Sequence, residues 1–103
     1  MLNLTNNEKE IVCEIAKQSF SKPIEIWAYG SRVNGDSHDG SDLDLVIRSN
    51  NLEKLKIDEY LDFKEKIKES NIPILVDCFD WSRLPDSFHS NILSNYEVLY
   101  SKK

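Results

Sequence analysis

Two short groups of residues in the middle of the chain have the types and spacing expected of a phosphate and metal site. Gly30 and Ser31 follow an apolar run, and Asp42 and Asp44 come after a short polar segment. Glycine lets a backbone turn approach a phosphate closely, because it has no Cβ atom. Two aspartates one residue apart on a strand project from the same face and can share divalent metals. Together the two groups predict a site for a nucleoside triphosphate and its magnesium ions.

A third carboxylate is expected on the acceptor side of such a site. Carboxylate oxygens suit Mg²⁺, which keeps water and substrate phosphates as its other ligands. Two such ions, roughly 3.5–4 Å apart, can hold the attacking and leaving oxygens of a phosphoryl transfer. Asp77 is the candidate, since an aspartate in the apolar run 74–79 costs several kcal/mol unless it is paired or metal-bound. Asp80 is the rival, although it is expected to point to the opposite side or to lie past the strand end.

Structural explanations stand beside these assignments. Asp42 and Asp44 could form a polar strand entrance, and Asp77 could be a buried carboxylate that backbone donors satisfy. The presence of Gly30 and Ser31 at the expected spacing from these acids favours the functional interpretation. In that interpretation the start of the expected helix at 30–34 also attracts anionic oxygens.

The neighbouring polar residues have weaker assignments. Arg32 either reaches the same phosphates or forms an ion pair within its loop, and Ser41 either caps the strand or contacts the water shell of the metal. His38 and His89 are expected to face solvent and receive no catalytic role. Trp27, Tyr29 and Trp81 are expected to pack in the core or at its rim; Trp81 could instead line a nucleotide site.

The hydrophobic pattern predicts elements in the order α-β-α-β-α-β-α. Thr5 and Glu8 match a capping box, so the first helix should begin near residue 6 and end before Pro23. The other expected elements are strands at 24–29, 43–47 and 74–79, helices at 30–34, 52–69 and after residue 86, and a final strand or ordered tail at 98–100. This order indicates an α+β (α/β-like) fold, with one sheet and helices packed on it.

Composition limits the class of protein. The 103 residues predict one domain spanning residues 1–103, and a net charge of −5 argues against direct nucleic-acid binding. No apolar run approaches the roughly 18 residues that span a membrane, and the N-terminus lacks a signal-peptide pattern, so a cytoplasmic protein is expected. Cys13 and Cys78 are too few for a disulfide framework or zinc site and are expected to be buried free thiols.

Residues 28–32 (Ala-Tyr-Gly-Ser-Arg) and 41–45 (Ser-Asp-Leu-Asp-Leu) together resemble the signature of the DNA polymerase beta-like nucleotidyltransferase superfamily. The short chain, Val76-Asp77 and the stretch 81–85 (Trp-Ser-Arg-Leu-Pro) are similar to its minimal nucleotidyltransferase branch. The resemblance covers nearly the whole chain, and the spacing from Gly-Ser to Asp-x-Asp is intact. The third acid is matched by its context rather than by a fixed spacing.

This resemblance implies a mixed sheet flanked by helices and a reaction that moves a nucleotidyl group from a triphosphate, usually ATP, to a hydroxyl. Members of the minimal branch are often antitoxins that transfer AMP to a tyrosine of a HEPN-domain RNase toxin. The expected cofactor is Mg²⁺, with two ions, and the expected partner is such a toxin. The expected site residues are Asp42, Asp44 and Asp77 for metal and catalysis, and Gly30, Ser31, Arg32 and Ser41 for the nucleotide.

Two other functions remain open from the sequence. The protein could be a binding module that neutralises a toxin by occlusion, although intact carboxylates argue against lost catalysis. It could also transfer a nucleotide to a small molecule such as an aminoglycoside, which the short chain makes less favourable because it leaves no room for an acceptor domain.

Overall fold

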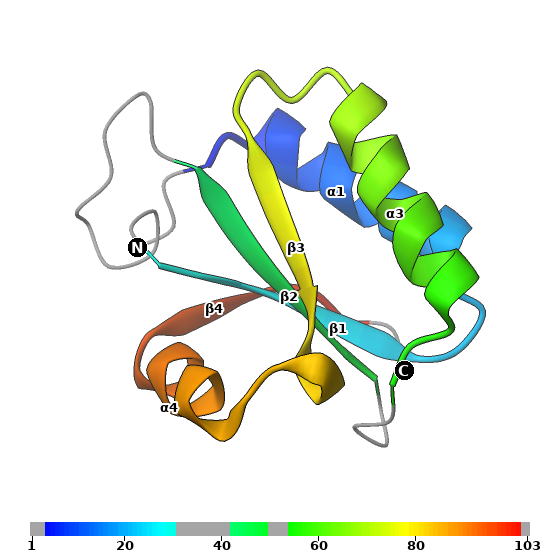
Figure 1. The fold of residues 1–103 in the computed structure, drawn as a ribbon. Coiled ribbons are helices and arrows are strands. Elements are labelled where there is room, and N and C mark those ends of the chain that lie inside the picture. Colours follow the sequence, from blue (N-terminus) through cyan, green and yellow to red (C-terminus); the bar gives the residue numbers. More distant parts are fainter. Residues whose placement is uncertain (1–3, 31–41, 50–53, 102–103) are drawn as a thin grey trace.

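A four-stranded sheet lies at the centre of the protein, with α1 and α3 on one face and α4 on the other (Figure 1). The computed structural model describes residues 4–30, 42–49 and 54–101. The elements are α1 (Asn6–Ser19), β1 (Ile24–Tyr29), β2 (Leu43–Ser49), α3 (Ile57–Glu69), β3 (Val76–Asp80), the 3₁₀ turn η1 (Trp81–Arg83), α4 (Asp86–Ser94) and β4 (Tyr96–Ser101). The predicted short helix at 30–34 falls almost wholly outside the described residues.

The sheet is mixed, as the sequence resemblance implied. Its strand order is β3-β2-β1-β4, with β2 and β3 parallel and the other two pairs antiparallel. The sequence predicted either a final strand or an ordered tail near the chain end. The structure shows the strand β4, whose backbone pairs with β1 from Glu25 to Tyr29. Strands β3 and β4 therefore form the two edges, and β1 and β2 are central.

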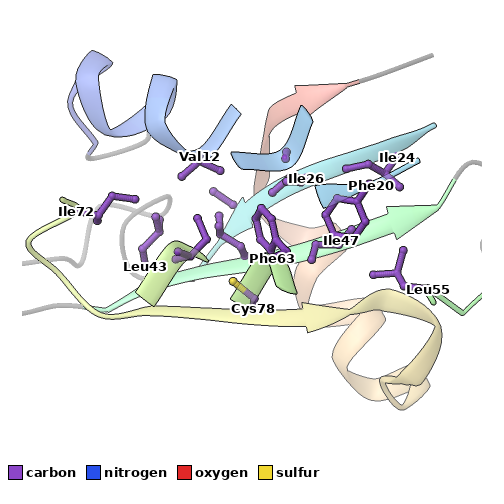
Figure 2. Close-up of a cluster of buried hydrophobic side chains, with 14 residues drawn as sticks. Val12, Phe20, Ile24, Ile26, Leu43, Ile47, Leu55, Phe63, Ile72 and Cys78 are labelled. Atoms are coloured by element: carbon purple, nitrogen blue, oxygen red, sulfur yellow. The ribbon is translucent and has the colours of Figure 1, made fainter. Parts of the chain in front are cut away.

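The main core lies between the sheet and the pair α1 and α3. Ile26 of β1 and Leu45 of β2 are fully buried there, and Figure 2 shows strand side chains meeting Phe63 of α3. Burying a side chain of this size stabilises the fold by about 1.5–3 kcal/mol. Because side chains alternate along a strand, burial of Leu43 and Leu45 turns Asp44 to the opposite face.

Helix α1 begins where the sequence predicts. The Thr5 hydroxyl accepts a hydrogen bond from the Glu8 backbone N–H at 3.1 Å, and the Glu8 carboxylate accepts one from the Thr5 N–H at 3.0 Å. This reciprocal capping box satisfies donors that a helix start leaves free. Across the described residues, no helix has the length and apolarity needed to cross a membrane.

Helix α3 begins later than the sequence predicts, at Ile57 instead of residue 52. The Leu55 N–H donates to the Asp80 carboxylate at 3.0 Å, and the Leu55 carbonyl accepts from the Arg83 guanidinium at 3.3 Å. Both backbone groups of Leu55 are thus bound to residues distant in sequence. These contacts hold the segment just before α3 in a non-helical conformation.

Candidate active site

One row of paired residues crosses all four strands near the end of β1 and carries two carboxylates. Asp44 lies opposite Tyr29 on one side and Asp77 on the other, and Tyr29 lies opposite Tyr96 of β4. Residues directly opposite each other on neighbouring strands project to the same side, about 5 Å apart. The structure therefore brings Asp44 and Asp77 together on the sheet face that carries α4.

The pKa of Asp44 reports this crowding of negative charge. Burial raises the pKa of the Asp44 carboxyl above its ordinary value, and the charges of Asp77 and Asp42 raise it further. Asp42 is exposed and stands immediately before β2, as the sequence predicts. Both other predicted acids thus act on Asp44, and the negative charge gathered there favours a bound cation.

Tyr29 is a residue of this site that sequence reasoning placed in the core or rim. Burial raises the pKa of its hydroxyl to about 12, with Asp44 and Asp77 as the next largest causes. The phenol therefore stays protonated at neutral pH and can donate a hydrogen bond beside the carboxylates. The sequence did contain a signal for this role, because Tyr29 ends an alternating strand directly before Gly30.

Gly30 is needed for contact with Asp44 as well as for its backbone conformation. Its φ is +85°, in the region that side chains other than glycine rarely adopt. A Cβ atom at this position would lie 2.5 Å from Asp44 Oδ2. The close neighbour of this glycine among the described residues is thus a carboxylate, and its predicted approach to a phosphate stays a prediction. Its predicted neighbours at the phosphate site, Ser31, Arg32 and Ser41, lie outside the described residues.

We expect Gly30→Ala to reduce nucleotidyl transfer by about 100-fold, because the new methyl group displaces the Asp44 carboxylate and small misplacements are costly in catalysis. The positive φ adds about 1–3 kcal/mol of strain, which should appear as a lower free energy of unfolding. Gln18→Ala, on the exposed side of α1, is the control and should change neither quantity. Wild-type transfer rates in Gly30→Ala would show that the carboxylate position is unimportant.

The described residues fit a metal that is shared with a substrate. Within the ranges 4–30, 42–49 and 54–101, no three His, Cys, Asp or Glu side chains are grouped so as to hold an ion. Mg²⁺ typically takes only one or two protein carboxylates and completes its octahedron with water and phosphate oxygens. The adjacent Asp44 and Asp77 match that donor set, and a preformed three-carboxylate cage is not observed among these residues.

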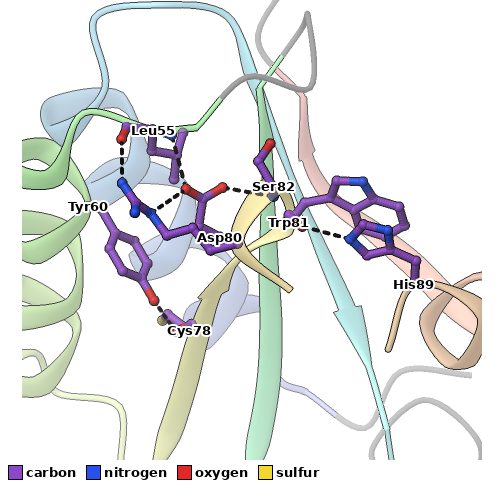
Figure 3. A network of polar contacts seen from close by, with 8 residues as sticks. Leu55, Tyr60, Cys78, Asp80, Trp81, Ser82 and His89 are labelled. Carbon is purple, nitrogen blue, oxygen red and sulfur yellow. Dashed lines mark hydrogen bonds and ion pairs between the residues drawn. The ribbon is translucent and has the colours of Figure 1, made fainter. Parts of the chain in front are cut away.

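Asp80 does not belong to this row. Its side chain is fully buried and accepts hydrogen bonds from the backbone N–H groups of Leu55 and Ser82 at 3.0 and 3.1 Å and from Arg83 Nε at 3.0 Å (Figure 3). Being three positions after Asp77, it projects from the opposite face of β3. The structure therefore separates the two acids that the sequence offered for the third position and leaves Asp77 beside Asp44.

The aromatic residues at the far end of this face pack against one another. Trp81 and His89 stack with ring centroids 3.9 Å apart, and His89 Nε2 lies 2.7 Å from the Trp81 carbonyl oxygen (Figure 3). The Arg48 guanidinium lies over both Trp27 and Trp81. The expectation that His89 faces solvent is wrong, because η1 places the Trp81 ring beneath it. Trp81 is buried, as expected of a packing residue.

The mixed four-stranded sheet with its helices agrees with the fold of nucleotidyltransferases. Residues 9–103 match the family described as polymerase beta, nucleotidyltransferase, and the chain belongs to this family. The sequence is also 35% identical over 108 aligned positions to a Haemophilus influenzae protein described as a probable protein adenylyltransferase, MntA. That alignment covers 99% of this chain and 87% of the relative. The resemblance inferred from the sequence is thereby confirmed.

Solved structures share the fold. A toxin-antitoxin structure with AMP-PNP superposes with a TM-score of 0.73 at 19% identity, covering 96% of this chain and 76% of the other. A complex of a tri-AMPylated Shewanella oneidensis HEPN toxin with an MNT antitoxin gives a TM-score of 0.68 at 15% identity, covering 91% and 70%. Identities this low establish the shared fold and leave the acceptor to be inferred.

Proposed function

We propose that this nucleotidyltransferase moves AMP from ATP to a tyrosine hydroxyl of a HEPN-domain RNase toxin and thereby acts as its antitoxin. The observation that carries the proposal is the pairing of Asp44 with Asp77 on an open face, with Gly30 against the Asp44 carboxylate. The name of the Haemophilus relative and the AMPylated toxin in a structural neighbour support a protein acceptor. ATP and an RNase toxin are found in the cytoplasm, where we place the reaction.

In the proposed reaction the acceptor oxygen attacks the α-phosphorus of ATP. A new P–O bond forms to the tyrosine, the bond from the α-phosphorus to the bridging oxygen breaks, and pyrophosphate leaves. Asp77, at the accessible edge of the row, receives the hydroxyl proton and passes it to water. Asp42, Asp44 and Asp77 would hold two Mg²⁺ ions, which neutralise charge on the phosphate oxygens. Much of the rate enhancement then comes from positioning and charge neutralisation.

The nucleotide contacts complete the proposal. Gly30 and Ser31 hold the triphosphate through the backbone, since a turn without a side chain allows close approach of the phosphates. Arg32 and Ser41 provide further polar contacts to phosphate and to its water shell. The Tyr29 hydroxyl, which remains protonated beside the carboxylates, is available to orient an oxygen of the substrate.

Radioactive transfer tests the proposed function directly. The protein is incubated with Mg²⁺, the product of the neighbouring reading frame as the candidate toxin, and each of the four α-³²P-labelled nucleoside triphosphates. We expect label from ATP on the toxin, no label after addition of EDTA, and no label on a toxin whose accepting tyrosine is replaced by phenylalanine. Transfer to an added aminoglycoside with none to the toxin would instead favour a small-molecule acceptor.

A further inference from the structure

Large apolar side chains remain exposed on α4 and β4. Phe88 and Leu93 of α4 are 49% and 52% exposed, and Tyr96 and Val98 of β4 are 39% and 49% exposed. We call these four residues the α4–β4 surface. Neighbouring exposed apolar residues of this size are typical of a surface that another molecule covers.

The α4–β4 surface adjoins the carboxylate row. Tyr96 is the first member of the row that continues through Tyr29 to Asp44 and Asp77. Neighbouring strands are spaced by about 4.8 Å, so the Tyr96 backbone lies about 10 Å from that of Asp44. Figure 1 shows α4 on the face opposite α1 and α3, leading back into β4 at this end of the sheet. A molecule seated on this surface is therefore within side-chain reach of the reacting groups.

The surface is held in place before any partner binds. The Tyr96 ring stacks on Trp27 with centroids 4.0 Å apart, and Trp27 is buried in a cluster with Ile92 of α4. A rigid aromatic residue loses little conformational entropy when it is covered. Ile92 thus anchors α4 on the sheet, and Phe88 and Leu93 remain exposed on the flanks of the helix.

The charge around this surface indicates the chemistry of the partner. Asp77 is exposed on the same face, and the Asp86 side chain at the start of α4 is fully exposed. Among the described residues, the only basic side chain within ion-pair distance of either acid is His89, at 3.8 Å from Asp86. The whole chain carries a net charge of −5. An apolar contact surface bordered by Lys and Arg would complement this arrangement.

We propose that the α4–β4 surface docks the protein acceptor, through an apolar contact surface with a basic border. The inference rests on the proposed function and adds where the toxin binds. From Tyr96 at this surface, Asp44 lies two strand spacings away and Asp77 three.

A second exposed apolar region provides an internal comparison. A groove of about 970 Å³ lies between α3 and residues 72–76 and includes Leu61 and Leu75, which are 54% and 73% exposed. Helix α3 covers the sheet face opposite the carboxylate row (Figure 1). A toxin bound in this groove would have to reach around the β3 edge to present its hydroxyl.

Matched substitutions distinguish the two surfaces. Leu93→Ser and Leu61→Ser each truncate a half-exposed leucine on a helix, and Asp86→Lys and Asp58→Lys each reverse an acid in a first helical turn. We expect Leu93→Ser to raise the dissociation constant for the toxin at least about tenfold and Leu61→Ser to change it less than about twofold. Asp86→Lys should slow association and weaken its salt dependence, whereas Asp58→Lys should not.

Binding is measured calorimetrically with the toxin whose accepting tyrosine is replaced by phenylalanine, and transfer is measured separately with the intact toxin. Thermal unfolding confirms that each variant is folded. Equal binding by Leu93→Ser and wild type would overturn the docking proposal, as would weaker binding by Leu61→Ser alone or self-association of the wild-type chain through Leu93. If the wild-type protein binds the toxin through Leu93 but transfers no AMP to it, docking stands and the proposed function fails.

Discussion

Replacing Asp44 with asparagine is expected to lower nucleotidyl transfer by a factor of about 10³ or more, equivalent to about 4 kcal/mol of transition-state stabilisation. Asp44 is the central acid of the row, with Tyr29 and Asp77 as its cross-strand neighbours. Asparagine has nearly the same size and can occupy the same space against Gly30. It lacks the negative charge that, in the proposed site, would hold a cation between protein and triphosphate, so we expect the chemistry to be lost while the packing is kept.

The same substitution should leave the protein as stable as wild type, or more stable. Burial, together with repulsion from Asp77 and Asp42, raises the pKa of Asp44 above its ordinary value of 3.8. The folded state therefore binds the proton of the Asp44 carboxyl more tightly than the unfolded state does. This protonation adds to the free energy of unfolding fully below the pKa of the unfolded state, and its contribution is lost as pH rises through the pKa of the folded state. At neutral pH the charge is destabilising, by at most about 1 kcal/mol because water screens a half-exposed group.

Urea unfolding at pH 7 and near pH 3 measures this difference, and α-labelled ATP measures transfer. Asp62→Asn is the control, since Asp62 is an exposed acid paired with Lys66 on α3. It should preserve both transfer and stability. An Asp44→Asn protein that labels the toxin at the wild-type rate would show that the catalytic assignment is wrong. An inactive Asp44→Asn protein that still neutralises the toxin fully would favour occlusion.

The orientation of the acids could be predicted because strand alternation is a local property. Buried Leu43 and Leu45 fix the side of β2 from which Asp44 projects, and both apolar positions are readable from the sequence. The partner of Asp44 could only be suggested, since the parallel register that brings Asp77 beside it is set by packing across more than thirty intervening residues. The sequence therefore identified the acids by context, and the sheet shows which two are neighbours.

Elements that depend on distant contacts were predicted less well. The start of α3 is displaced because Leu55 bonds to Asp80 and Arg83, a pairing that no helical periodicity contains. His89 was expected to face solvent, whereas its stacking partner Trp81 is supplied by the preceding turn. Both differences arise where a polar side chain satisfies a partner outside its own element.

Asp80→Ala is expected to lower the free energy of unfolding by about 3–5 kcal/mol, the usual cost of breaking a buried charged pair. The Asp80 carboxylate joins β3, η1 and the segment before α3 by accepting from Leu55, Ser82 and Arg83 (Figure 3). Alanine would leave the Leu55 N–H buried without its acceptor, which alone costs about 1–3 kcal/mol. Since small domains are stable by only about 5–15 kcal/mol, much of the margin would be lost.

Asp77→Ala is the matched comparison, three positions earlier on the same strand and exposed on the other face. It should abolish transfer and leave the unfolding free energy within about 0.5 kcal/mol of wild type, as is usual for surface substitutions. Asp80→Asn, which keeps an oxygen acceptor for Leu55, should be intermediate in stability and should retain transfer while folded. Circular dichroism during urea unfolding, combined with transfer assays below the transition, measures both effects.

An Asp80→Ala protein as stable as wild type would show that the buried carboxylate does not join these segments. An unstable Asp77→Ala protein would give that acid a structural role.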